Sequence, residues 1–255
     1  MATQLAAQLY TVREFMKTPK DMASSLKKIR DIGWEAVQLS GHGPIKPQEL
    51  RKMLDDAGLS VCATHTSFER MRDAMDEVME EHRILGCKNL AIGGLPGTYR
   101  EDGAAGYARF AKEASEVAKK LAENGFTWSY HNHSFELERF DGRTALAILY
   151  EESDPQYFLG EIDTYWIQHG GGDSAQWISD LKGRIKLLHL KDMGIVNRQQ
   201  VMTEIGEGNL NWPRILSAAA ESGVEWYIVE QDVCQRDPFE SLAISLRNLK
   251  AMGLK

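Results

Sequence analysis

The chain has 255 residues, 43% of them hydrophobic, which is enough to bury a large core and lies within the size range of one α/β barrel domain. Its formal net charge is −7, and acidic and basic residues are mixed along the whole length. A nucleic acid or an anionic membrane would favour a basic face, so the charge argues against both partners and favours a small-molecule substrate. The three cysteines, Cys62, Cys87 and Cys234, are far apart and predict neither a disulfide framework nor a thiolate zinc site.

No targeting segment is evident in the sequence. The first residues, MATQLAAQLYTVRE, contain no basic segment followed by a sustained apolar stretch, and no later window reaches a membrane-spanning length. A cytoplasmic location is therefore the expectation.

A pattern of three parts recurs in chain order: an amphipathic segment, then a glycine, then a short apolar run. Each glycine stands where a helix ends and a residue tolerant of positive φ is needed. Six helix-to-strand transitions are marked in this way, at Gly33, Gly58, Gly86, Gly125, Gly183 and Gly223. A seventh, before QYFLGEID, has Pro155 as its helix stop, and the chain opens directly with an apolar run at 5–10. Eight strands are predicted.

The segments between these strands have helical periodicity. Within 107–121, apolar residues repeat at the spacing i, i+3, i+4, i+7, and 239–249 repeats in the same way. The pairs Thr18-Pro19 and Asp237-Pro238 each combine a good N-cap with a proline at the first helical position. Helices are therefore predicted to begin at these two prolines.

Strict alternation of strand and helix predicts parallel strands, because each helix is the crossover between two of them. An open doubly wound sheet would alternate too, but eight strands with no GxGxxG after the first favour closure. The predicted fold is α/β, a (β/α)8 TIM barrel that forms a single domain over residues 1–255. The longest connection, from Asp192 to Trp212, is predicted to be a loop over the active face.

Polar and ionisable side chains gather at the predicted C-terminal strand ends, where such a barrel carries its active site. Six of the seven histidines lie at or just beyond a strand end, and His82 lies within a helix. In strand order, the polar residues are Gln8 and Tyr10, Gln38 and His42, His65, His131 and His133, Glu161 and Asp163, His189, Lys191 and Asp192, and Glu230 and Asp232.

Any one of these residues is more often scaffolding or surface than a ligand, and we hold that interpretation for His42, His169, Glu161 and Asp232. The group differs from its members, because ionisable side chains inside a barrel mouth are costly to desolvate unless they pair or bind a cation. Asp163, His189 and Glu230, on three consecutive strands, form a mixed N/O set suited to manganese, cobalt, magnesium or zinc. We predict a divalent metal site there, with Glu161 one layer deeper and not a ligand.

Five motifs carry a family resemblance: in chain order, WSYHNHSFE, GEIDTYW, LLHLKDM, IGEGNLNW and IVEQD. With them the chain resembles the sugar phosphate isomerase/epimerase group of xylose isomerase-like TIM barrels over essentially its whole length. That group includes ketose 3-epimerases, inosose isomerases and dehydratases and, more distantly, endonuclease IV. The resemblance implies a metal held by Glu, Asp, His and Glu from strands five to eight, and hence by Asp163, His189 and Glu230 here.

The chain departs from the group on strand five. Where the resemblance implies a catalytic, metal-binding glutamate, the chain reads YHNH, and His131 aligns best with the missing carboxylate. Of the two glutamates that exchange protons in such epimerases, Glu230 remains. A histidine is a competent base near neutral pH, so proton abstraction next to a metal-polarised carbonyl is retained. The predicted metal ligands are His131, Asp163, His189 and Glu230, and the predicted catalytic residues are Glu230, His133, His131 and Lys191.

Four residues are predicted to bind the substrate: His65, Trp166, Gln8 and Glu136. Trp166 follows strand six and could pack against a sugar ring. Lys191 could bind a substrate oxygen or orient His189, with Asp192 as an equally plausible salt-bridge partner. The segment IGEGN precedes a helix but carries no Lys or Arg, so we interpret it as a structural turn. This favours an unphosphorylated sugar or polyol as the small-molecule substrate.

Three functions remain open. The first is a metal-dependent isomerase or epimerase acting on a keto sugar or inosose. The second is a lyase or dehydratase that performs β-elimination on a keto sugar, keto glycoside or inosose, and the third is a non-catalytic carbohydrate-binding barrel. The histidines of strand five favour the second and third over the first, whereas Asp163, His189 and Glu230 count against the third. An endonuclease is least expected because no phosphate-binding surface is evident. A homo-oligomer is left open.

Overall fold

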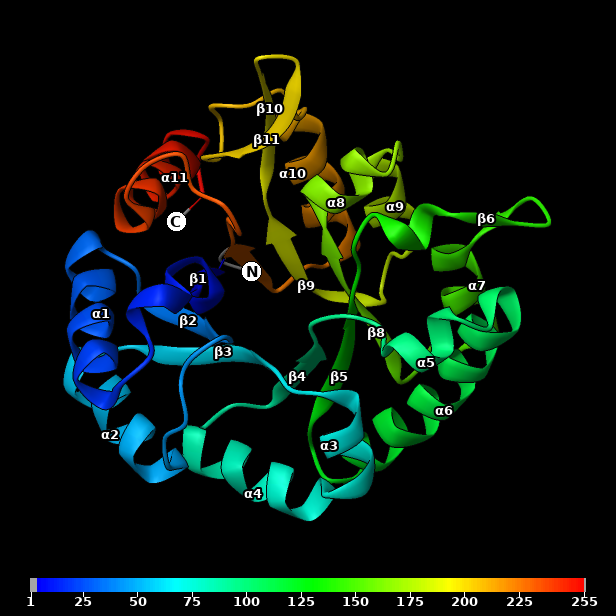
Figure 1. Ribbon diagram of the computed structural model, residues 1–255, viewed down its shortest axis with the longest axis horizontal. Coiled ribbons are helices and arrows are strands. Elements are labelled where there is room, and N and C mark those ends of the chain that lie inside the picture. The colour runs from blue at the N-terminus through cyan, green and yellow to red at the C-terminus, as the bar shows by residue number, and fades with distance from the viewer. Residues whose placement is uncertain (1–3, 255) are drawn as a thin grey trace.

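The computed structural model describes residues 4–254, so residues 1–3 and 255 of the predicted domain lie outside the described part. Eight parallel strands close into a barrel in the order β1-β12-β9-β8-β5-β4-β3-β2, and helices surround them (Figure 1). The predicted (β/α)8 fold is confirmed. No helix within 4–254 combines the length and the apolar character needed to cross a membrane.

Seven of the barrel strands lie within the predicted apolar runs. The strands are β1 Gln4–Gln8, β2 Ala36–Leu39, β3 Ser60–His65, β4 Asn89–Ile92, β5 Thr127–His131, β8 Phe158–Asp163, β9 Ile185–Leu190 and β12 Trp226–Val229. The first strand is shorter than predicted at its end, because the chain turns into the 3-10 helix η1 (Leu9–Phe15) after Gln8. Tyr10 therefore lies on η1 and not on the strand.

The helices begin and end close to the predicted signals. They are α1 Pro19–Ile32, α2 Pro47–Ala57, α3 Phe68–Asp73, α4 Met75–Leu85, α5 Gly97–Arg100, α6 Gly103–Glu123, η2 Phe135–Leu137, α7 Ala145–Glu152, α8 Thr164–His169, α9 Ser174–Asp180, α10 Trp212–Ser222 and α11 Pro238–Ala251. The side chains of Thr18 and Asp237 cap α1 and α11 as predicted. All six marker glycines have φ between 67° and 112°.

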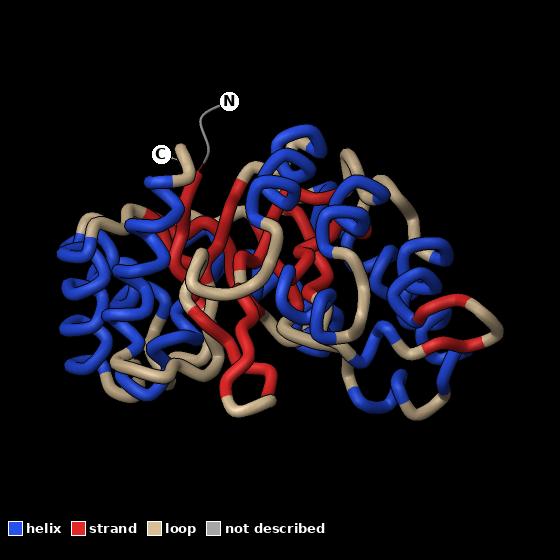
Figure 2. Tube along the Cα trace, turned by 90° about the horizontal axis from the view of Figure 1, so that it is seen from above, coloured by secondary structure: helices blue, strands red, loops and turns tan. Residues whose placement is uncertain are grey.

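Two hairpins stand outside the barrel (Figures 1 and 2). The first pairs β6 Arg139–Phe140 with β7 Arg143–Thr144. The second pairs β10 Asp192–Val196 with β11 Gln199–Thr203, in the connection that was predicted to be a loop. His169 also departs from its prediction, because it lies at the end of the short helix α8 and not at a strand end.

The barrel interior changes character along its axis. Near the N-terminal ends of the strands, small and apolar side chains form a cluster of Ala6, Ala36, Cys62, Ala63, Leu187 and Ile228. Side chains on a strand alternate between its two faces, so a residue two positions beyond a member of this cluster also points inward. On five strands these residues are Gln8, Gln38, His65, His189 and Glu230. The larger core lies between barrel and helices. The barrel thus has an apolar floor below a polar layer.

His82 on α4 offers a stability test at a helix residue outside the barrel. It is 2% exposed, with Nδ1 bonded to the Val78 carbonyl and Nε2 to Thr64 Oγ1, and burial lowers its pKa. The native state keeps His82 neutral, whereas the unfolded chain protonates it near an ordinary pKa of about 6.5. Stability should therefore fall as the pH drops below about 6.5, until native His82 is itself protonated.

We expect His82→Leu to lose this part of the acid sensitivity. The unfolding free energies of the wild type and of His82→Leu are measured by urea unfolding at several pH values between about 7.5 and about 5. The difference between the two proteins at each pH gives the contribution of His82. The wild-type protein should lose more stability than the variant on acidification. Parallel pH profiles would contradict a neutral buried His82.

Candidate metal centre and active-site cavity

Five ionisable side chains from four adjacent strands meet inside the polar layer of the barrel. β5 ends with His131, β8 with Glu161 and Asp163, β9 carries His189, and Glu230 follows β12 directly. Strands β5, β8, β9 and β12 are neighbours in the barrel, and Asp163 is paired in register with His189. All five side chains are at most 5% exposed, so their charges are compensated inside the protein.

The four predicted metal ligands come together. One ligand atom from each of His131, Asp163, His189 and Glu230 lies within 4.8 Å of all the others. His189 Nδ1 is 3.0 Å from Glu230 Oε2, and Asp163 Oδ2 is 3.9 Å from both His131 Nε2 and His189 Nδ1. Imidazole and carboxylate donors at such spacing suit a divalent transition metal. We name these four residues the upper set.

A second, deeper set shares two of these residues. His65, His131, Glu161 and His189 also bring ligand atoms within 4.8 Å of one another. Glu161 Oε2 is 2.6 Å from His65 Nε2, and Glu161 Oε1 accepts a hydrogen bond of 2.6 Å from Gln38 Nε2. Glu161 thus lies below Asp163 on the same face of β8, at the predicted depth. Its close contacts with three histidines were not predicted from the sequence. The two-residue spacing between Glu161 and Asp163 was the sequence signal that could have predicted these contacts, because it places both side chains inside the barrel.

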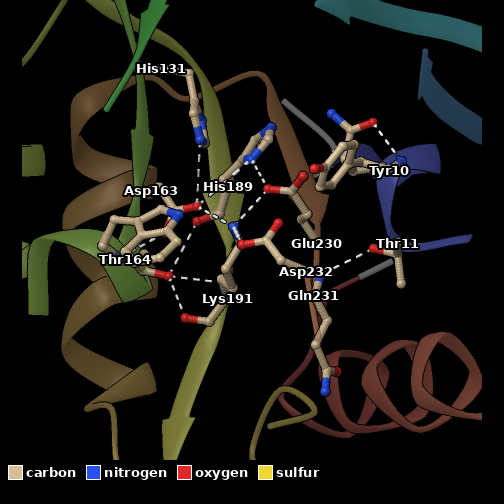
Figure 3. A network of polar contacts seen from close by, with 12 residues as sticks. Tyr10, Thr11, His131, Asp163, Thr164, His189, Lys191, Glu230, Gln231 and Asp232 are labelled. Carbon is tan, nitrogen blue, oxygen red and sulfur yellow. Dashed lines mark hydrogen bonds and ion pairs between the residues drawn. The ribbon is translucent and has the colours of Figure 1, made fainter. Parts of the chain in front are cut away.

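Lys191 is buried among carboxylates (Figure 3). Its ammonium is 3.0 Å from Asp163 Oδ2, 2.8 Å from Glu230 Oε2 and 3.0 Å from Asp232 Oδ2. Burial opposes its charge, but the three carboxylates outweigh burial and hold the pKa of Lys191 above its usual range. The suggested pairing of Lys191 with Asp192 is therefore wrong.

Asp192 is fully buried and organises the IGEGN segment. Its carboxylate accepts hydrogen bonds from the backbone N–H groups of Gly206, Gly208 and Leu210 and from Trp212 Nε1. The segment is a turn tied to the start of β10, as its lack of basic residues suggested. The carboxylate occupies the backbone donors that a phosphate would need.

The histidines differ in charge because their surroundings differ. Burial disfavours protonated His189, yet Glu161 and Glu230 outweigh burial and raise the pKa of His189 to about 10. Burial and neighbouring His189 hold the pKa of His131 well below its usual range. Burial, followed by the Lys191 ammonium, lowers the pKa of His133 to about 4. His131 and His133 are therefore neutral near pH 7.

A cavity of about 440 Å³ opens above the upper set. It is lined by Tyr10, Ser40, His65, Gly93, His131, His133, Trp166, Glu230 and Asp232. A larger cavity of about 630 Å³ lies at the N-terminal ends of the strands, between Trp34 and Trp226. Active sites of such barrels form at the C-terminal ends, so the smaller cavity is the candidate active site.

Two of the four predicted substrate contacts line this cavity and two do not. His65 and Trp166 reach it. Gln8 is fully buried below, where Nε2 donates to Gln38 Oε1 at 2.8 Å. Glu136 is also fully buried, and accepts hydrogen bonds from the Tyr130 hydroxyl and from the backbone N–H of His133. We therefore reassign Gln8 and Glu136 from substrate binding to positioning.

Tyr10 lines the cavity although the sequence analysis assigned it no role. The Arg13 guanidinium lies 4.2 Å from the centre of its ring and also donates to the Asp232 carbonyl. A side chain at Gly41 would collide with the Tyr10 ring, with its Cβ 2.8 Å from Tyr10 Cδ2. The ring is thus packed in place at the mouth.

Several buried polar atoms of the site lack a hydrogen-bond partner within residues 4–254. They include His131 Nδ1, His133 Nδ1, Asp163 Oδ2 and Trp166 Nε1. Asp163 Oδ2 retains its ion pair with Lys191, but without hydrogen-bond geometry. Unsatisfied polar atoms are costly in a protein interior, and these four belong to residues at or next to one cavity. These atoms are free to form hydrogen bonds with polar or charged groups that enter the cavity.

Comparison with known proteins gives one family and several relatives. The model of the xylose isomerase-like TIM barrel family matches residues 26–252. The rhizopine catabolism protein MocC of Rhizobium meliloti is 22% identical over 89% of this chain and 80% of its own length. A sugar phosphate isomerase/epimerase structure from Parabacteroides distasonis is 26% identical, with a TM-score of 0.78 over 100% of this chain and 96% of that chain. A structure of L-ribulose 3-epimerase is 16% identical, with a TM-score of 0.72 over 100% and 95% of the two chains.

Proposed function

Because the chain belongs to the xylose isomerase-like TIM barrel family, we propose that it is a divalent-metal-dependent enzyme that removes a proton next to the carbonyl of a keto sugar or inosose. Membership of this family agrees with the five motifs found in the sequence. The observation that carries the proposal is the upper set, His131, Asp163, His189 and Glu230, buried directly below the cavity. The outcome is an isomerisation or epimerisation, as in the L-ribulose 3-epimerase that shares this fold.

The charge of the site supports a bound cation. Asp163, Glu230 and Asp232 surround the Lys191 ammonium. Glu161 adds a fourth carboxylate, which lies 3.4 Å from His189 Nε2, so the four carboxylates outnumber the two basic side chains. Asp163 Oδ2, which accepts no hydrogen bond within residues 4–254, also fits a ligand role. The residues of the upper set would hold the ion, and a bound ion would polarise the substrate carbonyl and stabilise developing negative charge. Binding requires neutral His189, so a proton leaves that residue when the site is loaded.

We assign proton removal to His133. Its side chain lines the cavity, and its Nδ1 has no hydrogen-bond partner within the described residues. Glu136 holds its backbone N–H, and its ring stacks on Phe135 with centroids 5.6 Å apart. The Trp166 ring is also close, at 5.4 Å between centroids. A base fixed in this way next to the cavity meets the geometric requirement for general base catalysis.

Lys191 is assigned a positioning role. Its ammonium contacts Asp163, Glu230 and Asp232, and the side chain is 1% exposed. It therefore orients two ligands of the upper set and limits the repulsion between them. Its approach to the ring of Trp166, at 5.5 Å, also ties the upper set to the wall of the cavity.

β-Elimination is the second candidate, and strand β5 favours it. Two-carboxylate epimerisation needs a second acid on the opposite face of the substrate. In place of a glutamate, β5 ends with His131, and His133 follows two residues later. Elimination from a keto sugar, keto glycoside or inosose needs one base and a proton for the leaving group. Both reactions begin with the same proton removal. A non-catalytic carbohydrate-binding barrel would not need the buried ionisable set.

Solvent deuterium exchange tests the shared first step. Protein loaded with manganese, cobalt, magnesium or zinc is incubated in D2O with keto sugars and inososes, and deuterium at the carbon next to the carbonyl is measured by NMR. We expect exchange that requires the ion and stops after chelation. Rapid product formation without exchange would contradict the proposed chemistry.

Metal analysis tests the choice between the two ligand sets. We expect about one ion per chain, as a single four-ligand site implies, with binding abolished in Asp163→Asn. Glu161→Gln should retain the ion and weaken its affinity by at most about 10- to 100-fold, because Glu161 only supports His189 from below. Loss of the ion in Glu161→Gln with retention in Asp163→Asn would place it in the deeper set instead.

A further inference from the structure

A second cavity of about 420 Å³ lies beside the candidate active site on the same face of the barrel. It is formed by the connections that follow β2 and β3, together with the adjoining parts of α2 and α4. The two cavities share Ser40 and His65 as lining residues. They are therefore neighbours along one surface, and a ligand that fills the first can extend into the second past these two side chains.

The lining of the second cavity is half apolar and half polar. Leu39, Ile45, Leu50 and Leu85 provide the apolar part. On the polar side, the Arg70 guanidinium donates to Glu81 at 2.8 Å, and His42 Nδ1 is bonded to the Gly43 carbonyl. The charge of Arg70 is thus already compensated, which disfavours a phosphate. Such a mixed lining fits a neutral ring that has C–H faces and a few hydroxyl groups.

We propose that the second cavity is a leaving-group subsite, which receives the second ring of a two-part substrate whose keto ring occupies the first cavity. The inference rests on β-elimination, the second candidate of the proposed function. Ligand pockets usually measure roughly 300 to 1,000 Å³, so each cavity is large enough to hold one ring, and the two together suit a molecule of two rings. A glycoside bearing a ring ketone has this shape.

With the second ring in the subsite, the elimination would break the bond between the two rings. The base takes the proton from the carbon next to the ketone, and its C–H electron pair forms the new C=C bond. The C–O bond to the second ring breaks, and the departing oxygen takes a proton. The products are an unsaturated keto sugar and the free alcohol of the second ring. No oxidant or reductant is consumed.

Filling the subsite tests the proposal. Ile45 is half-buried and lines the second cavity but not the first, so Ile45→Trp should fill it without touching the upper set. The probes are the methyl and phenyl glycosides of one sugar that carries a ring ketone. With manganese-loaded protein, we expect kcat/KM for the phenyl glycoside to fall by about tenfold or more, and that for the methyl glycoside to stay within about twofold.

The control and the contrary outcomes are distinct. Ile45→Ala enlarges the same cavity and should keep the preference for the phenyl glycoside. Equal losses of kcat/KM for both probes, or no loss for either, would overturn the subsite. Competition by orthophosphate against the phenyl glycoside in the wild type, but not in Ile45→Trp, would also overturn it. Calorimetric binding of both probes separates the two hypotheses. Absence of turnover contradicts β-elimination, while the binding difference between wild type and Ile45→Trp still decides on the subsite.

Discussion

Replacing His133 with alanine is expected to leave a divalent ion bound and to slow proton exchange by about 10²- to 10⁴-fold, the usual share of a general base. His131→Ala is expected to have the opposite signature, with a marked loss of metal affinity. The two side chains are two residues apart on the same face of β5 and its extension, but at different heights. His131 is 2% exposed and faces Asp163, whereas His133 lines the cavity wall next to Trp166.

Metal titration and solvent exchange, measured on the same preparations, separate the two roles. His42→Ala is a suitable control, because His42 lies outside the first cavity and should affect neither measurement with a one-ring substrate. If His133→Ala retains full exchange, another residue is the base. If His131→Ala binds the ion with unchanged affinity, the upper set has three protein ligands and His131 is a neighbour.

Lys191→Met is expected to destabilise the metal-free protein by about 3 to 5 kcal/mol, the usual effect of removing one partner from a buried ion pair. The substitution leaves Asp163, Glu230 and Asp232 close together without their cation. A divalent ion in the upper set would compensate two of these carboxylates. Added manganese should therefore recover part of the lost unfolding free energy.

Lys186→Met provides a matched control on the same strand. Lys186 pairs with Glu225 at the surface, where both side chains are more than one third exposed, and such pairs contribute less than about 1 kcal/mol. The unfolding free energies of Lys191→Met and Lys186→Met are measured in urea, each with and without manganese. Equal destabilisation by the two substitutions would show that Lys191 is not the counterion of the site.

The sequence by itself determined the barrel and the height at which its polar residues lie. The helix ends could be predicted because the residue that ends a helix often has positive φ, a conformation that strongly favours glycine. This preference is local and does not depend on the rest of the fold. The inward position of Glu161 below Asp163 followed from the two-residue repeat of a strand. Register within a closed barrel then placed Asp163 beside His189, as expected from consecutive strands.

Tertiary structure decided which polar groups pair with one another. Lys191 is next to Asp192 in the chain, yet successive residues of an extended segment point to opposite faces, so its partners are carboxylates from β8 and beyond β12. Glu136 was readable as part of a polar motif, but η2 turns its carboxylate under His133 and away from the cavity. The second cavity is formed by connections after β2 and β3, and its shape depends on how two irregular segments pack, which no periodic pattern encodes.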